Sequence, residues 1–79
     1  MPVVLYLTSD EERKVEGADA ARLDGGFFVV AKRRPGTGAL ETVLTLWAPD
    51  VIAADVTENG VTVNRVLGLG KRPDPGGKI

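Results

Sequence analysis

The sequence contains no cysteine and no histidine. The chain therefore has no disulfide, no thiolate or imidazole metal ligand, no cysteine nucleophile and no catalytic triad with a histidine base. No pair of carboxylates is brought together by sequence spacing for general acid–base chemistry. These absences predict a protein that is not an enzyme and that holds neither a metal ion nor a cofactor.

Long apolar runs are missing as well. The stretch over residues 27–31 is far shorter than the roughly 20 residues that span a bilayer. The apolar beginning of the chain, residues 1–7, has no basic leader and no cleavage site with small residues, both of which a signal peptide requires. We therefore expect a cytoplasmic protein without a membrane span, and the lack of cysteine fits a reducing compartment.

The chain has 79 residues and a formal net charge of −1. A chain of this length forms one domain and buries only about 60% of its unfolded surface, which leaves a thin core. After Gly70 the composition changes, with two prolines and two glycines in nine residues. Such a segment builds neither a strand nor a helix. We predict a single β domain over residues 1–70 and a flexible tail over residues 71–79.

Apolar residues recur mainly at every second position, which is typical of β-strands. This alternation predicts strands over residues 2–8, 27–34 and 40–47. Residues 13–16 are expected to form another strand, and the capping pattern that begins at Ser9 makes a short helix the alternative. In residues 40–47 the alternation divides the side chains between two faces, one with Leu40, Thr42, Leu44 and Leu46 and the other with Glu41, Val43, Thr45 and Trp47.

The strongest local signal is Asn59-Gly60, which lies between two alternating runs. Asn-Gly is the preferred loop of a type I′ hairpin, because both residues tolerate positive φ angles. This loop predicts a register in which Ala54 faces Arg65. One face of the hairpin then carries Arg65 as its single charge among these apolar residues: Ile52, Ala54, Val56, Val61, Val63 and Leu67. A hairpin with one apolar face must pack against another part of the molecule.

Three further breaks in the pattern are predicted. Asp24-Gly25-Gly26 forms a tight turn, and the segment 35–38 offers a type II turn in which Pro35 and Gly36 are the two central residues. Pro49-Asp50 interrupts the chain after Trp47, either as a bend or as one helical turn that begins at the proline.

Together these features predict an all-β fold. Five or six short antiparallel strands are expected to form a small meander that curls into a twisted sheet or a small barrel. The order of strands and turns over residues 3–67 resembles that of short β-rich proteins of unknown function from actinobacteria and their phages. The resemblance includes no diagnostic motif, so it implies neither an activity nor a site.

Six basic residues are candidates for contact with nucleic acid, namely Lys32, Arg33, Arg34, Arg65, Lys71 and Arg72. Residues 32–34 form a run at the end of a strand, beside a glycine-containing loop, where charged side chains and backbone N–H groups suit phosphate. The same charges also keep the end of a sheet edge from pairing with other chains. Because the chain as a whole is slightly acidic, nucleic-acid binding is the alternative hypothesis and not the leading one.

Two other clusters lack the spacing of a known site. The segment Gly68-Leu69-Gly70-Lys71 has neither the spacing nor the Ser or Thr of a phosphate loop, and Pro73 prevents the helix that such a loop requires. The acidic residues 10–12, with Glu16 and Asp19 nearby, lack the spacing and the glycine of a calcium loop. We expect a strand end in the first case and a polar turn in the second.

The aromatic residues are the candidates for a protein interface: Tyr6, Phe27, Phe28 and Trp47. Phe27 and Phe28 are adjacent, so on a strand they point to opposite faces and cannot both enter one core. An oligomer interface covers such surplus apolar side chains, and base stacking is their alternative use. We predict a small non-enzymatic interaction or assembly module, which associates with itself or with another protein.

Overall fold

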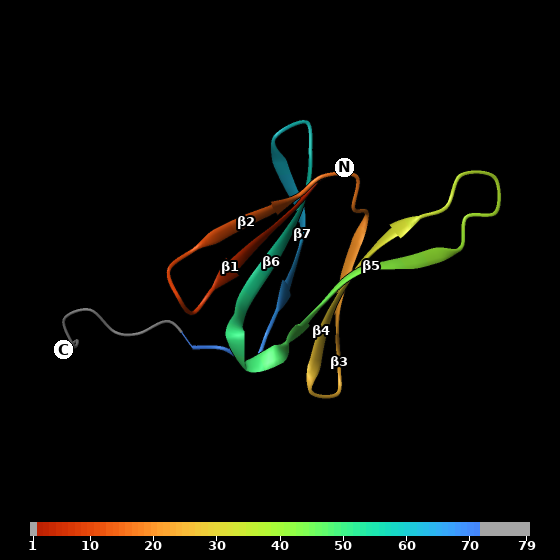
Figure 1. Ribbon diagram of the computed structural model, residues 1–79. Helices are drawn as coiled ribbons and strands as arrows, with labels where there is room; N and C mark the ends of the chain where they lie inside the picture. Colours follow the sequence, from red (N-terminus) through yellow and green to blue (C-terminus); the bar gives the residue numbers. More distant parts are fainter. Residues whose placement is uncertain (1, 72–79) are drawn as a thin grey trace.

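The computed structural model of the protein describes residues 2–71. These residues form seven β-strands and one 3₁₀ turn, arranged as two antiparallel sheets (Figure 1). The prediction of an all-β antiparallel fold is confirmed, and the strands are distributed over two sheets where one curled meander of five or six strands was expected. The predicted tail, apart from Lys71, lies outside the described residues.

The four-stranded sheet has the order β2-β1-β6-β7 and combines the first and the last hairpin of the described chain. Its strands are β1 (Val3–Leu7), β2 (Glu12–Val15), β6 (Val51–Glu58) and β7 (Val61–Leu67). The three-stranded sheet has the order β3-β4-β5 and consists of β3 (Ala20–Asp24), β4 (Phe27–Arg33) and β5 (Leu40–Trp47). β1 pairs with β6, and the three strands of the other sheet lie between these two strands in the sequence. This pairing joins two segments that are distant in sequence.

The core lies between the two sheets and takes side chains from both of them. Phe28 and Val30 of β4 are fully buried, and they belong to the same cluster as Val3, Leu5 and Val51 of the four-stranded sheet. Partly buried side chains surround this cluster: Leu7, Val15, Ala21, Leu44, Leu46 and Val66. Each sheet is too small to bury a core on its own, so the two layers share one.

Residues 9–24 contain two strands and no helix. β2 confirms the strand expected over residues 13–16. β3 is a strand that the sequence did not predict, because Ala20 and Ala21 have little preference for strands. β3 is held by pairing with β4 along its whole length. The connecting turn includes Gly25, whose φ of 60° suits glycine.

The predicted turns have the expected backbone angles. Asn59 and Gly60 have φ angles of 54° and 80°, which confirms the type I′ loop between β6 and β7. Gly36 has a φ of 91°, as the second central position of a type II turn requires. Ala48–Asp50 form the 3₁₀ turn, so the interruption after Trp47 is a helical turn and not a simple bend, and it begins at Ala48, one residue before the proline.

The predicted register of the β6–β7 hairpin is correct only next to its loop. Val63 is an extra residue in β7, a β-bulge, and beyond it Asp55 faces Arg65 where Ala54 was expected to face it. The bulge moves Arg65 from the core face to the outer face of the sheet. The apolar face that we predicted for β7 is therefore wrong, and these three side chains are exposed: Val61, Val63 and Leu67.

The chain after β7 packs closely against the beginning of β6. The backbone N–H groups of Gly68 and Gly70 donate hydrogen bonds of 3.0 and 2.8 Å to the carbonyl oxygens of Ile52 and Val51. A Cβ atom on Gly68 would collide with the Val51 carbonyl, and one on Gly70 would lie 2.7 Å from the carbonyl oxygen of Pro49. Close backbone packing accounts for both glycines, in the part of the chain where we predicted a strand end.

Candidate functional site

The outer face of the three-stranded sheet carries an exposed aromatic pair. Phe27 of β4 and Trp47 of β5 are directly opposite each other across the two strands. Their ring centroids are 5.6 Å apart and the rings meet edge to face, at an angle of 67°. Phe27 is 48% exposed and Trp47 is 59% exposed, so about half of this pair contacts solvent.

The same face continues from the aromatic pair toward the far end of β5. Val29 and Ala31 follow Phe27 at every second position of β4, and both side chains are buried beneath this face. A hollow of about 220 Å³ lies over them, and its lining includes Ala20 of β3 and Leu40 of β5. We call this surface the apolar patch, defined by Phe27, Trp47, Leu40, Val29 and Ala31.

A bulge in β5 decides which side chains belong to the apolar patch. Val43 is an extra residue between Thr42, which faces Ala31, and Leu44, which faces Val30. Without this bulge, Leu40 and Trp47 would point to opposite faces, as the sequence alternation predicted. That prediction is wrong. The bulge brings Leu40 and Trp47 to the same face, while Leu44 and Leu46 point to the core, as partly buried side chains.

The four aromatic candidates occupy three different places. Phe28 is fully buried between the sheets and is the largest side chain of the core, so it lies outside the apolar patch. Phe27 points to the opposite face, as expected for adjacent residues on a strand. Tyr6 belongs to the outer face of the other sheet, where it lines a hollow of about 430 Å³ together with Ala53, Arg65 and other residues.

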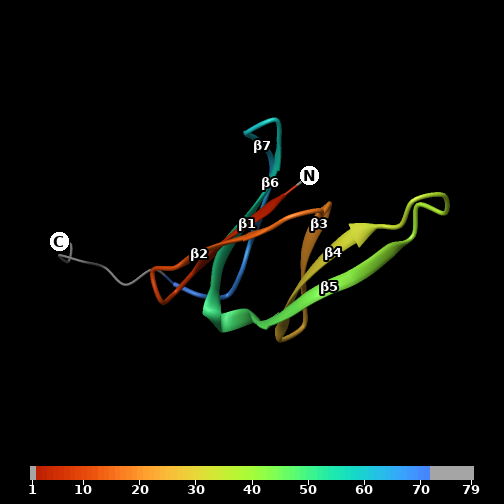
Figure 2. The same ribbon diagram turned by 45° about the horizontal axis from the view of Figure 1, so that its top comes forward.

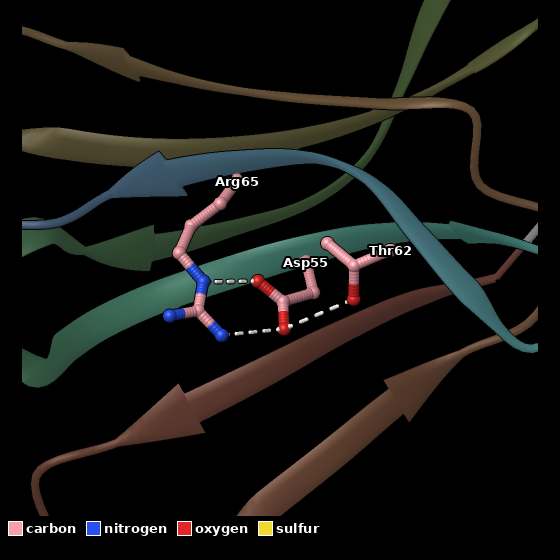
Figure 3. A network of polar contacts seen from close by, with 3 residues as sticks. All are labelled: Asp55, Thr62 and Arg65. Carbon is pink, nitrogen blue, oxygen red and sulfur yellow. Dashed lines mark hydrogen bonds and ion pairs between the residues drawn. The ribbon is translucent and has the colours of Figure 1, made fainter.

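A charged network lies on that outer face of the four-stranded sheet (Figure 3). The Arg65 guanidinium donates two hydrogen bonds to Asp55, from Nε to Oδ1 at 2.6 Å and from Nη2 to Oδ2 at 2.9 Å. The hydroxyl of Thr62 lies 3.5 Å from the same Oδ2 atom. Asp55 is only 3% exposed, and all buried side-chain polar atoms among the described residues have a hydrogen-bond partner. The network is therefore internally satisfied.

The network changes the acidity of its members. The hydrogen bonds from Arg65 hold the pKa of Asp55 below its ordinary value of 3.8, and they outweigh the burial of the carboxylate, which acts in the opposite direction. Thr62 and Tyr6 add smaller contributions that also lower the pKa of Asp55. The same pairing raises the pKa of Arg65. Asp55 is thus a charged side chain that stabilises the sheet, and it has no proton to donate near neutral pH.

The sequence contains a signal for this network. The predicted register placed Arg65 as the single charge on an apolar face, which conflicts with the cost of burying an unpaired charge. A shift of one residue resolves that conflict, because it moves Arg65 to the outer face and opposite Asp55.

The basic candidates do not gather on one surface. Lys32 and Arg33 end β4, and Arg34 begins the loop of the β4–β5 hairpin, whose tip projects away from the other strands in both views (Figures 1 and 2). Arg65 lies on the other sheet, Lys71 follows β7, and Arg72 lies outside the described residues.

Three of the arginines also have partners within the chain. Arg34 Nη2 lies 3.3 Å from Glu41 Oε1, and Arg33 Nη1 donates a hydrogen bond of 3.0 Å to the carbonyl oxygen of Gly38. Arg65 is paired with Asp55, as described above. These contacts stabilise the β4–β5 hairpin and the four-stranded sheet. The two carboxylate partners also neutralise part of the positive charge that phosphate binding would use.

Of the acidic residues 10–12, Asp10 and Glu11 lie at the turn between β1 and β2, and Glu12 is the first residue of β2. Asp10 has a φ of 71°, and Ser9 Oγ donates a hydrogen bond of 3.0 Å to Glu11 Oε1. Within residues 2–71, no group of three or more acidic side chains is arranged to hold a metal ion. The segment has the polar turn that we expected.

Comparisons with family models, with curated proteins and with solved structures found no match to this chain. Among the described residues, no helix has the length and the apolar character needed to cross a membrane. We therefore infer function from the surfaces of the molecule itself.

Proposed function

We propose that the protein is a small non-enzymatic interaction module that associates with itself through the apolar patch. The observation that carries this proposal is the half-exposed pair of Phe27 and Trp47, next to Leu40 on the same sheet face. Aromatic side chains of this kind supply much of the binding energy in protein interfaces. Leaving them in contact with water favours aggregation, which a defined interface prevents.

A second copy of the chain is the partner that the composition favours. A chain of 79 residues has a limited core, and association with another copy buries additional apolar surface. The formal net charge of −1 produces little repulsion between identical chains. A two-fold arrangement places the same patch on both sides of the interface, which matches apolar surface with apolar surface.

Nucleic-acid binding is the alternative proposal, and the contacts within the chain support it less well. Arg34 and Arg65 each have a carboxylate partner. A phosphate backbone would have to compete with these partners. Binding to phosphate would depend steeply on salt concentration. Self-association through an apolar patch would depend on it little.

Light scattering after size-exclusion chromatography tests the proposal, together with the fluorescence of the single tryptophan. We expect a mass of a multiple of 8.3 kDa at micromolar concentration, and an emission maximum of Trp47 that moves to longer wavelength on dilution. The variant Phe27→Ala keeps Trp47 and removes its neighbour, so it should shift the protein toward monomer. Leu67→Ala, an exposed leucine of the other sheet, is the matched control.

A folded monomer at every accessible concentration would overturn the proposal of self-association. If Phe27→Ala and Leu67→Ala weaken self-association equally, the apolar patch is not the interface. A salt-sensitive complex with DNA or RNA at submicromolar concentration would favour the alternative.

A further inference from the structure

The two sheets have four edge strands, and three of them have features that discourage pairing with another chain. β2 contains Glu12, Arg13 and Lys14 in four residues, and charges of this kind protect an edge. β3 is short and carries the ion pair between Arg22 and Asp24, at 3.6 Å. β7 contains an arginine, and β3 of the other sheet lies close to it.

β5 is the least protected of the four edges, and the bulge at Val43 is its main feature of this kind. It extends over eight residues, Leu40–Trp47, and its single charged residue is Glu41, next to its first position. On the side away from β4 it pairs with no strand within residues 2–71. Exposed apolar side chains occur at its start, middle and end: Leu40, Val43 and Trp47. A long and apolar edge is a template for the addition of another strand.

The bulge gives β5 a pattern that is symmetric about its centre. On the outer face the side chains are Leu40, Thr42, Thr45 and Trp47, with spacings of two, three and two residues. Thr42 and Thr45 pair with Ala31 and Val29, which are two residues apart on β4. The side chains of Thr42 and Thr45 therefore point to the same face, and their backbone N–H and C=O groups point to the same side of the strand. The exposed edge thus offers equivalent positions on both sides of its centre.

We propose that a second copy of this chain adds to β5 in antiparallel orientation about a two-fold axis near Val43. In this register Leu40 of one copy faces the partner's Trp47, and Thr42 faces the partner's Thr45. Pairs of an aromatic with an aliphatic side chain and of two threonines are both favourable across antiparallel strands. This inference rests on the proposed self-association and names its geometry.

The pairing joins the two three-stranded sheets into one sheet of six strands. Leu40 and Trp47 are the part of each apolar patch that this pairing brings into contact, with Trp47 at the seam next to the partner's Leu40. The edge-to-face pair of Phe27 and Trp47 remains intact, because Phe27 lies on the opposite side of Trp47 from the new strand. The unpaired N–H and C=O groups of β5 gain partners, which is the main source of affinity when a strand is added to a sheet edge.

Matched lysine variants of the two bulge residues test the location of the interface. Val43 and Val63 are each the extra residue of a bulged edge strand, and they are 44% and 52% exposed. Val43→Lys places two like charges close to the axis, and we expect the dissociation constant of the dimer to rise by about tenfold or more. Val63→Lys should change it by less than about twofold, as surface charges outside an interface do. Circular dichroism establishes that both variants fold.

Cysteine variants test the register, and the natural chain supplies no competing thiol. Thr42→Cys and Thr45→Cys are prepared separately and oxidised alone and as an equal mixture. Directly opposite residues have Cβ atoms about 4.5–5.5 Å apart, close enough for a disulfide after a small adjustment. We expect covalent dimers in the mixture and few in either variant alone, because each cysteine faces a threonine of an identical partner.

The outcomes separate this inference from the proposed function. If the wild type is a dimer and Val43→Lys leaves it a dimer, the pairing through β5 is wrong while self-association stands. Cross-linking that is equally efficient in the three cysteine samples overturns the register. A monomeric wild type overturns the proposed function, and the pairing through β5 with it.

Discussion

β5 and β7 are both edge strands with one extra residue, and the two bulges have opposite consequences. In β7 the extra residue is Val63, and the shift brings Arg65 opposite Asp55, where the two side chains form a bidentate ion pair. In β5 the extra residue is Val43, and the shift brings Leu40 onto the face of Trp47. One bulge completes a polar network within the chain, and the other creates an apolar surface.

A bulge by itself determines neither a polar network nor an apolar surface. Beyond the extra residue, each side chain of the strand points to the face opposite to the one that simple alternation predicts. The result depends on which side chains change face. On β7 the exchanged residue is a charge that finds a partner on the neighbouring strand. On β5 the exchanged residue is Leu40, whose neighbours on the outer face are Ala31 and Arg33 of β4. Phe27, Leu40 and Trp47 of this apolar surface therefore remain exposed in the part of the chain that the structure describes.

The largest expected effect on stability is at the ion pair between β6 and β7, in which Asp55 is buried and Arg65 is exposed. Asp55→Ala removes both hydrogen bonds from Arg65, and we expect it to lower the free energy of unfolding by about 1.5–3 kcal/mol, the usual contribution of a hydrogen bond to a charged group. Urea denaturation at pH 7 and one fixed protein concentration measures this loss. An unchanged unfolding midpoint would show that the network contributes no stability.

The pH dependence of stability tests whether the ionised carboxylate of Asp55 stabilises the fold. The pKa of Asp55 is lower in the folded chain than its ordinary value of 3.8, so its carboxylate stabilises the fold above that value. The contribution is lost as the pH falls through the folded pKa, because the unfolded chain binds the proton first. We expect the stability difference between wild type and Asp55→Asn to be constant above about pH 5 and to shrink below pH 3.8. A difference that grows on acidification would contradict this assignment.

The loop next to the bulge of β7 gives an intermediate effect. Asn59 and Gly60 both have positive φ, so Gly60→Val should cost about 1 kcal/mol or more, since β-branched residues resist this conformation. Gly26→Ala is the control, because Gly26 does not have a positive φ and a Cβ atom there meets no neighbour within 4 Å. Equal thermal stability of the two variants would argue that the tight loop does not hold the register of β7.

The smallest effect is expected at the ion pair of the β4–β5 hairpin. Arg34 and Glu41 are 3.3 Å apart, and the side chains are 60% and 46% exposed. Pairs of this kind contribute only about 0.2–1 kcal/mol, because water and salt screen them. Glu41→Ala should therefore lower the unfolding free energy less than Asp55→Ala does. If Glu41→Ala and Asp55→Ala lower the unfolding free energy by similar amounts, the ion pairs of β5 and β7 do not differ in their contribution to stability.

Local features of the fold were predictable from the sequence to a large extent. The strands over residues 27–34 and 40–47 follow from the alternation of apolar side chains, and the hairpin loop follows from Asn59-Gly60. β3 was not predictable in this way, because Ala20 and Ala21 form a strand only through pairing with β4. The two bulges were also missed, since a bulge depends on the neighbouring strand and leaves no fixed pattern in its own sequence.

The candidate site was predictable as a set of residues and not as a surface. Adjacent phenylalanines on a strand must point to opposite faces, so the sequence required one of them to lie outside the core. Which one is buried depends on the side from which the four-stranded sheet packs, and that sheet covers Phe28. The neighbours of Phe27 on the open face depend in turn on the bulge at Val43.

The sequence by itself determined the strands other than β3, the tight turns and the surplus of apolar side chains, because these depend on backbone angles and on alternation along one segment. The tertiary structure decided the pairing of β1 with β6, the burial of Phe28 and the two register shifts. Each of these depends on contacts between segments that are distant in sequence, or on the choice between registers that local preferences leave nearly equal. Packing of the shared core and the pairing of Asp55 with Arg65 make that choice.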